Sequence, residues 1–92
     1  MQTNKQRIHQ KILQAFFKDL AELPKFGTAP DTANLFVLLE EAEAKAHGLG
    51  MRSWAASAHI IHSRGRCRAH VSLGGERFAL VASETAWRLT CE

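Results

Sequence analysis

The sequence predicts an α+β fold in which two N-terminal amphipathic helices pack on one face of a four-stranded antiparallel β-meander, in the order ααββββ. Its length of 92 residues predicts a single domain spanning residues 1–92. Apolar residues recur every three or four positions up to residue 47, and at every second position after Gly50. Two glycine-containing turns, at residues 64–65 and 74–75, divide the second half into strands.

The first helix is predicted over about residues 3–23. Its apolar side chains form one stripe at helical spacing: Ile8, Ile12, Leu13, Phe16, Phe17 and Leu20. Thr3 and Gln6 have the spacing of a capping box, in which each side chain accepts a hydrogen bond from the other residue's backbone N–H. Pro24 cannot continue the helix, so we expect the helix to end just before it.

The second helix is predicted over about residues 29–47, with its start near Thr28 or Asp31. Thr28 and Asp31 have the spacing of another capping box, and Gly48 with Leu49 indicates a Schellman-type end. The predicted buried face consists of Leu35, Phe36, Leu38, Leu39 and Ala42. Three glutamates, at positions 40, 41 and 43, lie within one turn without a convergent partner, and we interpret them as surface charge rather than as an acid–base pair.

The four strands are predicted over about residues 52–63, 66–73, 76–83 and 86–91. Two-residue turns at 64–65 and 74–75 and a further turn near 84–85 place these residues opposite each other: His62 and Cys67, Ile60 and Ala69, Val71 and Phe78, Ala82 and Trp87, Leu80 and Leu89. The face that the helices cover then carries Trp54, Ile60, Val71, Phe78, Leu80, Trp87 and Leu89. Glu84-Thr85 is a poor turn sequence, so a terminal helical turn is the alternative to the last strand.

The stretch HIIHSRGRCRAH, residues 59–70, has the residue types of a zinc site or of a cysteine–histidine pair. The predicted register points His62 and Cys67 toward the helices, and His59 and His70 away from them. Four ligands divided between two faces cannot share one ion, so we predict no metal site and no cofactor. His62 and Cys67 lack a third, orienting residue and are interpreted as packing at the edge of the core. A disulfide between Cys67 and Cys91 is disfavoured because a strand lies between them.

The composition narrows the class of protein further. Two cysteines predict a reducing cytoplasm, and the longest apolar run, LFVLL, is far shorter than a membrane span. Phosphate-binding loops, dinucleotide-binding glycine motifs, nucleophile elbows and H-E-x-x-H motifs are absent, so we do not expect an enzyme. Residues 48–92 carry the whole net charge of +3, as six arginines against three glutamates and no lysine.

We expect the basic side chains to gather on the open face of the sheet, since two helices can cover only one side of it. The predicted binding residues are His59, Ile61, Arg64, Arg66, Arg68, His70, Arg77, Val81 and Arg88. Nucleic acid is the favoured partner, although the face lacks an aromatic platform for base stacking. The alternative is an accessory or inhibitor of the phage or mobile-element type, for example an anti-defence protein, that docks on an acidic protein surface. Homodimerisation through the edge strand or the open face is a third possibility.

Overall fold

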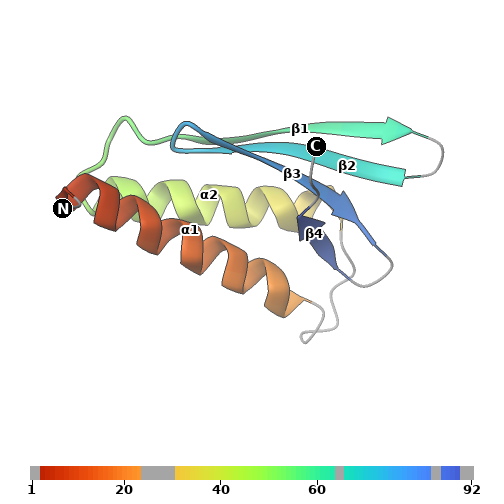
Figure 1. Cartoon of the computed structure of the whole chain (residues 1–92), viewed down its shortest axis with the longest axis horizontal. Helices are drawn as coiled ribbons and strands as arrows, with labels where there is room; N and C mark the ends of the chain where they lie inside the picture. Colours follow the sequence, from red (N-terminus) through yellow and green to blue (C-terminus); the bar gives the residue numbers. More distant parts are fainter. Residues whose placement is uncertain (1–2, 24–30, 64–65, 84–85, 90–92) are drawn as a thin grey trace.

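A computed structural model of the chain has the α+β architecture that the sequence predicts: two N-terminal helices followed by a four-stranded antiparallel sheet (Figure 1). It describes residues 3–23, 31–63, 66–83 and 86–89. The elements in chain order are α1 (Asn4–Glu22), α2 (Thr32–Gly48), β1 (Ala56–Ser63), β2 (Arg66–Leu73), β3 (Glu76–Ala82) and β4 (Trp87–Leu89). The strands lie side by side in the order β1-β2-β3-β4, so β1 and β4 are the two edges of the sheet.

Both helices lie on the same side of the sheet and form one layer beneath it (Figure 1). Helix α2 runs under β1, and α1 packs beside α2. The buried core between the layers consists of Ile12, Leu13, Phe16, Leu20, Leu35, Leu38, Leu39, Ala42, Ala46, Trp54, Ala69, Val71, Leu73, Leu80 and Trp87. Over the described residues, neither helix combines the length and apolar character needed to cross a membrane.

The helix ends agree with the sequence at α1 and differ at α2. Thr3 and Gln6 form the predicted capping box. At α2 the capping residue is Asp31, which forms its capping box with Asn34, so the helix begins at the later of its two expected starts. Thr28 itself lies outside the described residues. The helix ends in a Schellman motif, but the residue with positive φ is Gly50 (φ 92°), two positions after the expected Gly48.

The predicted register of the sheet is confirmed throughout the described strands. Strands β1 and β2 pair from Ala56↔Leu73 to Ser63↔Arg66. The β2–β3 and β3–β4 pairs also have the partners that the sequence predicts. The first strand is shorter than predicted, because residues 52–53 form a turn that is closed by a hydrogen bond from Trp54 N–H to the Met51 carbonyl. Trp54 is buried as expected, but it lies in the connection before β1.

The last strand is a true strand, and the alternative helical turn does not form. It is short, covering three residues, and residues 90–92 and the predicted turn at 84–85 lie outside the described residues. Its buried side chain is Trp87, whose Nε1–H lies 3.3 Å from the Asp31 carbonyl and 3.4 Å from Asn34 Oδ1, which ties β4 to the start of α2. Two apolar residues expected in the core are instead exposed: Leu89, which lies on the edge strand β4, and Phe36 on α2.

Candidate functional site

The face of the sheet opposite the helices, here called the outer face, brings the predicted binding residues together. The confirmed register arranges them in three rows across the strands: Ile61, Arg68, Val81 and Arg88; His59, His70 and Ala79; and Ser57, Ser72 and Arg77. Arg66 lies two residues from Arg68 on β2 and shares its face. The histidines and these four arginines are exposed, and Ile61 and Val81 are half-buried on either side of Arg68. Arg64, the remaining predicted residue, lies outside the described residues.

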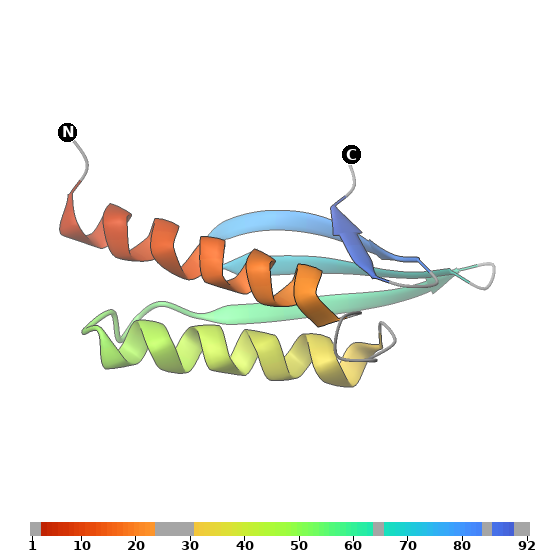
Figure 2. The same cartoon turned by 90° about the horizontal axis from the view of Figure 1, so that it is seen from below.

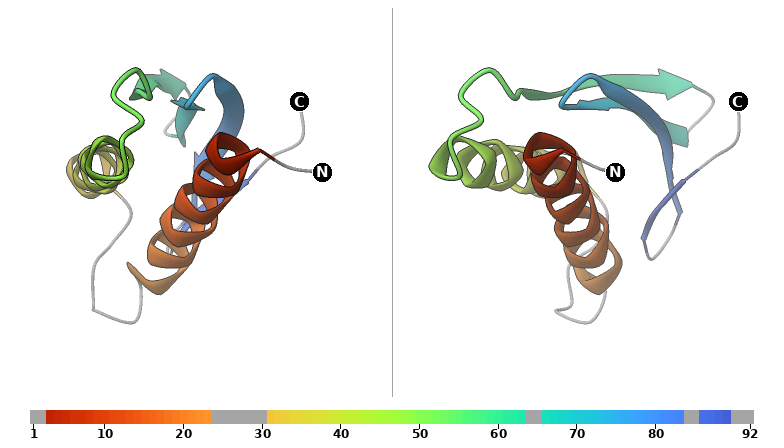
Figure 3. Two further views of the ribbon diagram at one scale, coloured as in Figure 1. Left: turned by 90° about the vertical axis from the view of Figure 1, so that its left-hand side faces the viewer. Right: turned by 60° about the vertical axis from the view of Figure 1, so that its left-hand side comes forward.

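The formal charges on the described residues of the outer face all belong to arginines. None of the described residues in its three rows is acidic, and the carboxylate of Glu76, at the start of β3, is bonded instead to His9 on α1. Strand spacing puts Arg68 and Arg88 about 10 Å apart, with Val81 between them, and places Arg77 about 13 Å farther along the sheet. The sheet curls around α1, so this basic face is its convex side (Figure 3).

The end of the β1–β2 hairpin projects beyond both helices (Figures 1 and 2). Strand β3 pairs with β2 only as far as Arg68↔Val81, whereas β1 and β2 continue to Ser63↔Arg66. His62 is consequently exposed, although it points to the helix side of the sheet, and the prediction that it closes the core edge is wrong. Its partner Cys67 is half-buried and packs against the core. Strand alternation indicated the correct face for His62, but not where the helices end.

The confirmed register also separates the four residues that suggested a metal site. His62 and Cys67 are opposite each other on one face, and His59 and His70 are opposite each other on the other face. Among the described residues, no group of three or more histidine, cysteine or acidic side chains is placed to hold a metal ion. Cys91, the second cysteine, lies outside the described residues, so the absence of a disulfide stays a prediction.

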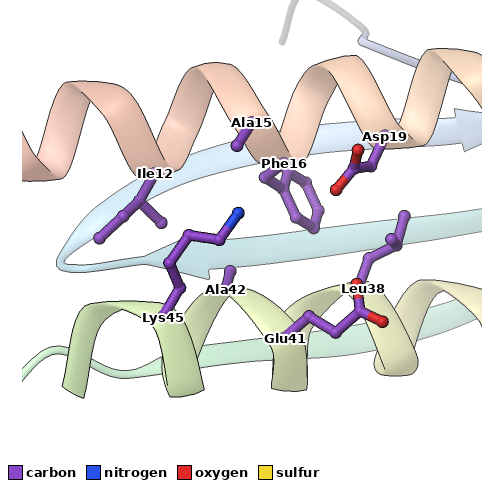
Figure 4. Close-up of a pocket in the computed structure, with 8 residues that line it drawn as sticks. All are labelled: Ile12, Ala15, Phe16, Asp19, Leu38, Glu41, Ala42 and Lys45. Atoms are coloured by element: carbon purple, nitrogen blue, oxygen red, sulfur yellow. The ribbon is translucent and has the colours of Figure 1, made fainter. Parts of the chain in front are cut away.

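Two hollows lie in the described part of the molecule, and the larger one reaches Ser57 and Ser72 of the outer face. The first, between α1 and α2, has a volume of about 10 Å³, enough for one water molecule (Figure 4). Asp19 and Lys45 extend into it from opposite helices. The second has a volume of about 380 Å³ and lies at the Gly74–Gly75 end of the sheet. It is lined by Met51, Ser53, Trp54, Ala55, Ser57, Ser72, Gly74 and Gly75, none of which is ionisable near neutral pH.

A chain of hydrogen bonds that no sequence pattern indicated joins α1 to the connection before β1 and to the start of β3. Trp54 Nε1–H donates to His9 Nδ1 at 2.9 Å, so the proton of the neutral imidazole is on Nε2, which lies 3.1 Å from Glu76 Oε1. His47 Nε2 donates to the Trp54 carbonyl at 2.8 Å. The carboxylate–histidine order is that of a catalytic triad, but an indole N–H takes the place of the nucleophile. The cluster therefore links both helices to Trp54 before β1, and α1 also to the start of β3.

Replacing His9 with alanine is expected to destabilise the protein by about 1–3 kcal/mol, because the buried indole N–H of Trp54 loses its acceptor. The measurement is urea denaturation followed by circular dichroism. Gln10→Ala is the matched control, since Gln10 is the exposed neighbour on the same helix and its truncation should change the unfolding free energy by less than about 0.5 kcal/mol. Equal stability of the two variants would show that the Trp54–His9 bond contributes nothing.

Comparisons of this chain with protein-family models, with curated proteins and with solved structures find no match. Its function must therefore be inferred from the outer face itself. That face offers arginine guanidinium groups that bind phosphate or carboxylate oxygens through two parallel hydrogen bonds, with small apolar side chains between them. Such a surface is suited to binding an extended anionic partner.

Proposed function

We propose that this protein is a non-enzymatic binding protein that holds nucleic acid on the outer face of its sheet. The observation that carries the proposal is the placement of four exposed arginines, Arg66, Arg68, Arg77 and Arg88, on one convex face without an acidic residue among the described residues of its rows. Nucleic acid is the most abundant extended polyanion in a cytoplasm, the compartment that the low cysteine content predicts for the chain. Its phosphates supply the affinity, and arginine binds each of them bidentately.

The spacing of the arginines supports contact with several phosphates at once. Arg68 and Arg88 flank Val81 in one row, and Arg77 lies two rows away, so the charges cover an area rather than a point. A small anion would need two or three converging side chains and a concave pocket. The convex shape of the outer face favours a long backbone that crosses it (Figure 3).

Charge reversal at Arg77 and Arg88 tests the proposal. We expect the double variant Arg77→Glu/Arg88→Glu to bind a short oligonucleotide at least about tenfold more weakly at about 50 mM salt. The slope of log affinity against log salt should also become shallower by about one for each phosphate that the variant no longer binds. Fluorescence anisotropy with labelled DNA and RNA measures both quantities.

Arg7→Glu/Lys11→Glu is the control for net charge, because both residues are exposed on α1 in the helix layer and the double variant undergoes the same change of charge. We expect it to leave the salt slope unchanged. An equal drop in affinity in both double variants would mean that net charge alone draws the protein to nucleic acid. Failure of the unaltered protein to bind any DNA or RNA at about 50 mM salt would contradict the function itself.

An acidic protein surface is the second candidate partner, and the half-burial of Ile61 and Val81 on either side of Arg68 favours it. Arginine beside apolar side chains is typical of the centre of a protein interface. An inhibitor of the phage or mobile-element type, or a homodimer through β1 or the outer face, would use the same residues. Capture experiments in nuclease-treated lysate, with Arg88→Glu as the negative control, distinguish a protein partner from nucleic acid.

A further inference from the structure

The projecting end of the β1–β2 hairpin is a two-stranded ribbon with an exposed side chain on each of its faces. Here it is called the ribbon and comprises residues 62–63 and 66–67, which extend past the last β2–β3 pair, Arg68↔Val81. His62 is exposed on the helix side, and Arg66 and Arg68 are exposed on the outer face. The described residues from 59 to 70 include no acidic side chain. The outer face explains the two arginines, but it does not explain why the sheet continues past the helices that cover its other side.

The dimensions of the ribbon match those of one nucleic-acid groove. Two paired strands lie about 4.8 Å apart, and the major groove of B-form DNA, about 12 Å wide and 8.5 Å deep, admits a two-stranded ribbon with its side chains. We infer that the ribbon enters the major groove of duplex DNA, with Arg66 toward the base edges and His62 facing the opposite wall. This inference rests on the proposed function and names its substrate class.

The distribution of aromatic residues supports a duplex rather than a single strand. Proteins that bind single strands stack the bases on exposed aromatic rings. The described residues of the outer face and of the ribbon include no phenylalanine, tyrosine or tryptophan. Trp54 and Trp87 are buried, and Phe78 packs edge-on against Phe17 of α1 with ring centroids 5.1 Å apart. The described part of the surface can therefore contact a phosphate backbone, but it offers unpaired bases no aromatic ring to stack on.

The shape of the ribbon supports DNA rather than duplex RNA. The major groove of A-form RNA is deep and too narrow for protein side chains to read. In B-form DNA, guanine O6 and N7 at the floor of the major groove accept two hydrogen bonds from one arginine. Arg77, about 13 Å along the sheet from the row of Arg68, is then placed to contact phosphates outside the groove.

The experiment compares His62→Glu with Gln14→Glu, an equal change of charge at an exposed position of α1. His62 points away from the outer face. If the outer face alone contacted DNA, His62→Glu would therefore leave the affinity for DNA unchanged. Insertion of the ribbon predicts a loss of at least about tenfold in affinity for duplex DNA. Circular dichroism confirms the fold of each variant. A second measurement uses the unaltered protein and duplex DNA whose cytosines carry glucosyl groups in the major groove, for which we expect a similar loss.

Each result supports or overturns the inference. Weaker binding in both measurements, with no effect of a drug that fills the minor groove, supports it. Normal affinity of His62→Glu for duplex DNA, with loss on Arg77→Glu/Arg88→Glu, overturns it and leaves the proposed function in place. Tighter binding of single strands or of duplex RNA than of duplex DNA also overturns the inference but leaves the proposed function in place. If no nucleic acid binds and a lysate protein is captured instead, the inference and the proposed function fail together.

Discussion

Replacing Gly74 with alanine should remove a large part of the stability of the domain, by about 2–5 kcal/mol out of the 5–15 kcal/mol typical of a native protein. Gly74 has a φ of 58°, at which a β-carbon costs about 1–2 kcal/mol. The added β-carbon would also overlap the indole of Trp54, within 2.6 Å of Cδ1 and 2.7 Å of Cε2. Overpacking of this kind costs about a further 1–3 kcal/mol.

The indole cannot move aside without further loss. Trp54 is 4% exposed, and its Nε1–H is engaged by His9 at 2.9 Å. Gly75→Ala is the matched control, because Gly75 also has a positive φ, 93°, and a β-carbon there would meet no atom within 4 Å. It should cost about 1–2 kcal/mol from the backbone alone. Urea denaturation of both variants gives the difference, and equal costs would mean that the Trp54 ring yields to the new methyl group.

The pairing of the strands could be predicted because its determinants are local. The glycine turn at residues 74–75 and the alternation of apolar and polar side chains each fix the same register, and a slip of one residue would turn every side chain to the wrong face. The first capping box could also be predicted from the sequence, since Thr3 and Gln6 are three residues apart. At α2 the same rule failed because Asp31 has no glutamate or glutamine three residues later, and Asn34 fills that role.

How far the strands continue past the ends of the helices that cover them could not be predicted from the sequence. Strand alternation placed His62, Cys67 and Leu89 on the helix side, but it holds no information about where the helices stop. The contact between Trp54 and Gly74 joins residues far apart in the chain, and so does the bond from Trp54 to His9. The residues of the outer face could be predicted from the alternation of side chains along the strands alone. The projecting ribbon could not, because it exists only where the β1–β2 hairpin is longer than the helix layer beneath it.

Leu80 and Leu89 are a direct test of this layer boundary, because they are cross-strand partners with the same side chain and opposite exposure. Leu80 is fully buried and Leu89 is 60% exposed. Leu80→Ala should cost about 2–5 kcal/mol, from reduced burial and the cavity that remains. Leu89→Ala removes the same atoms and should cost less than about 0.5 kcal/mol.

Urea denaturation of the two leucine variants at several protein concentrations gives the decisive comparison. A large loss of unfolding free energy for Leu80→Ala but not for Leu89→Ala, independent of protein concentration, places the limit of the core between β3 and the end of β4. A comparable cost for Leu89→Ala that grows with protein concentration would instead mean that a second copy covers the β4 edge, because mass action makes the stability of a dimer depend on concentration. The exposed fraction of Leu89 in the single chain predicts the first result.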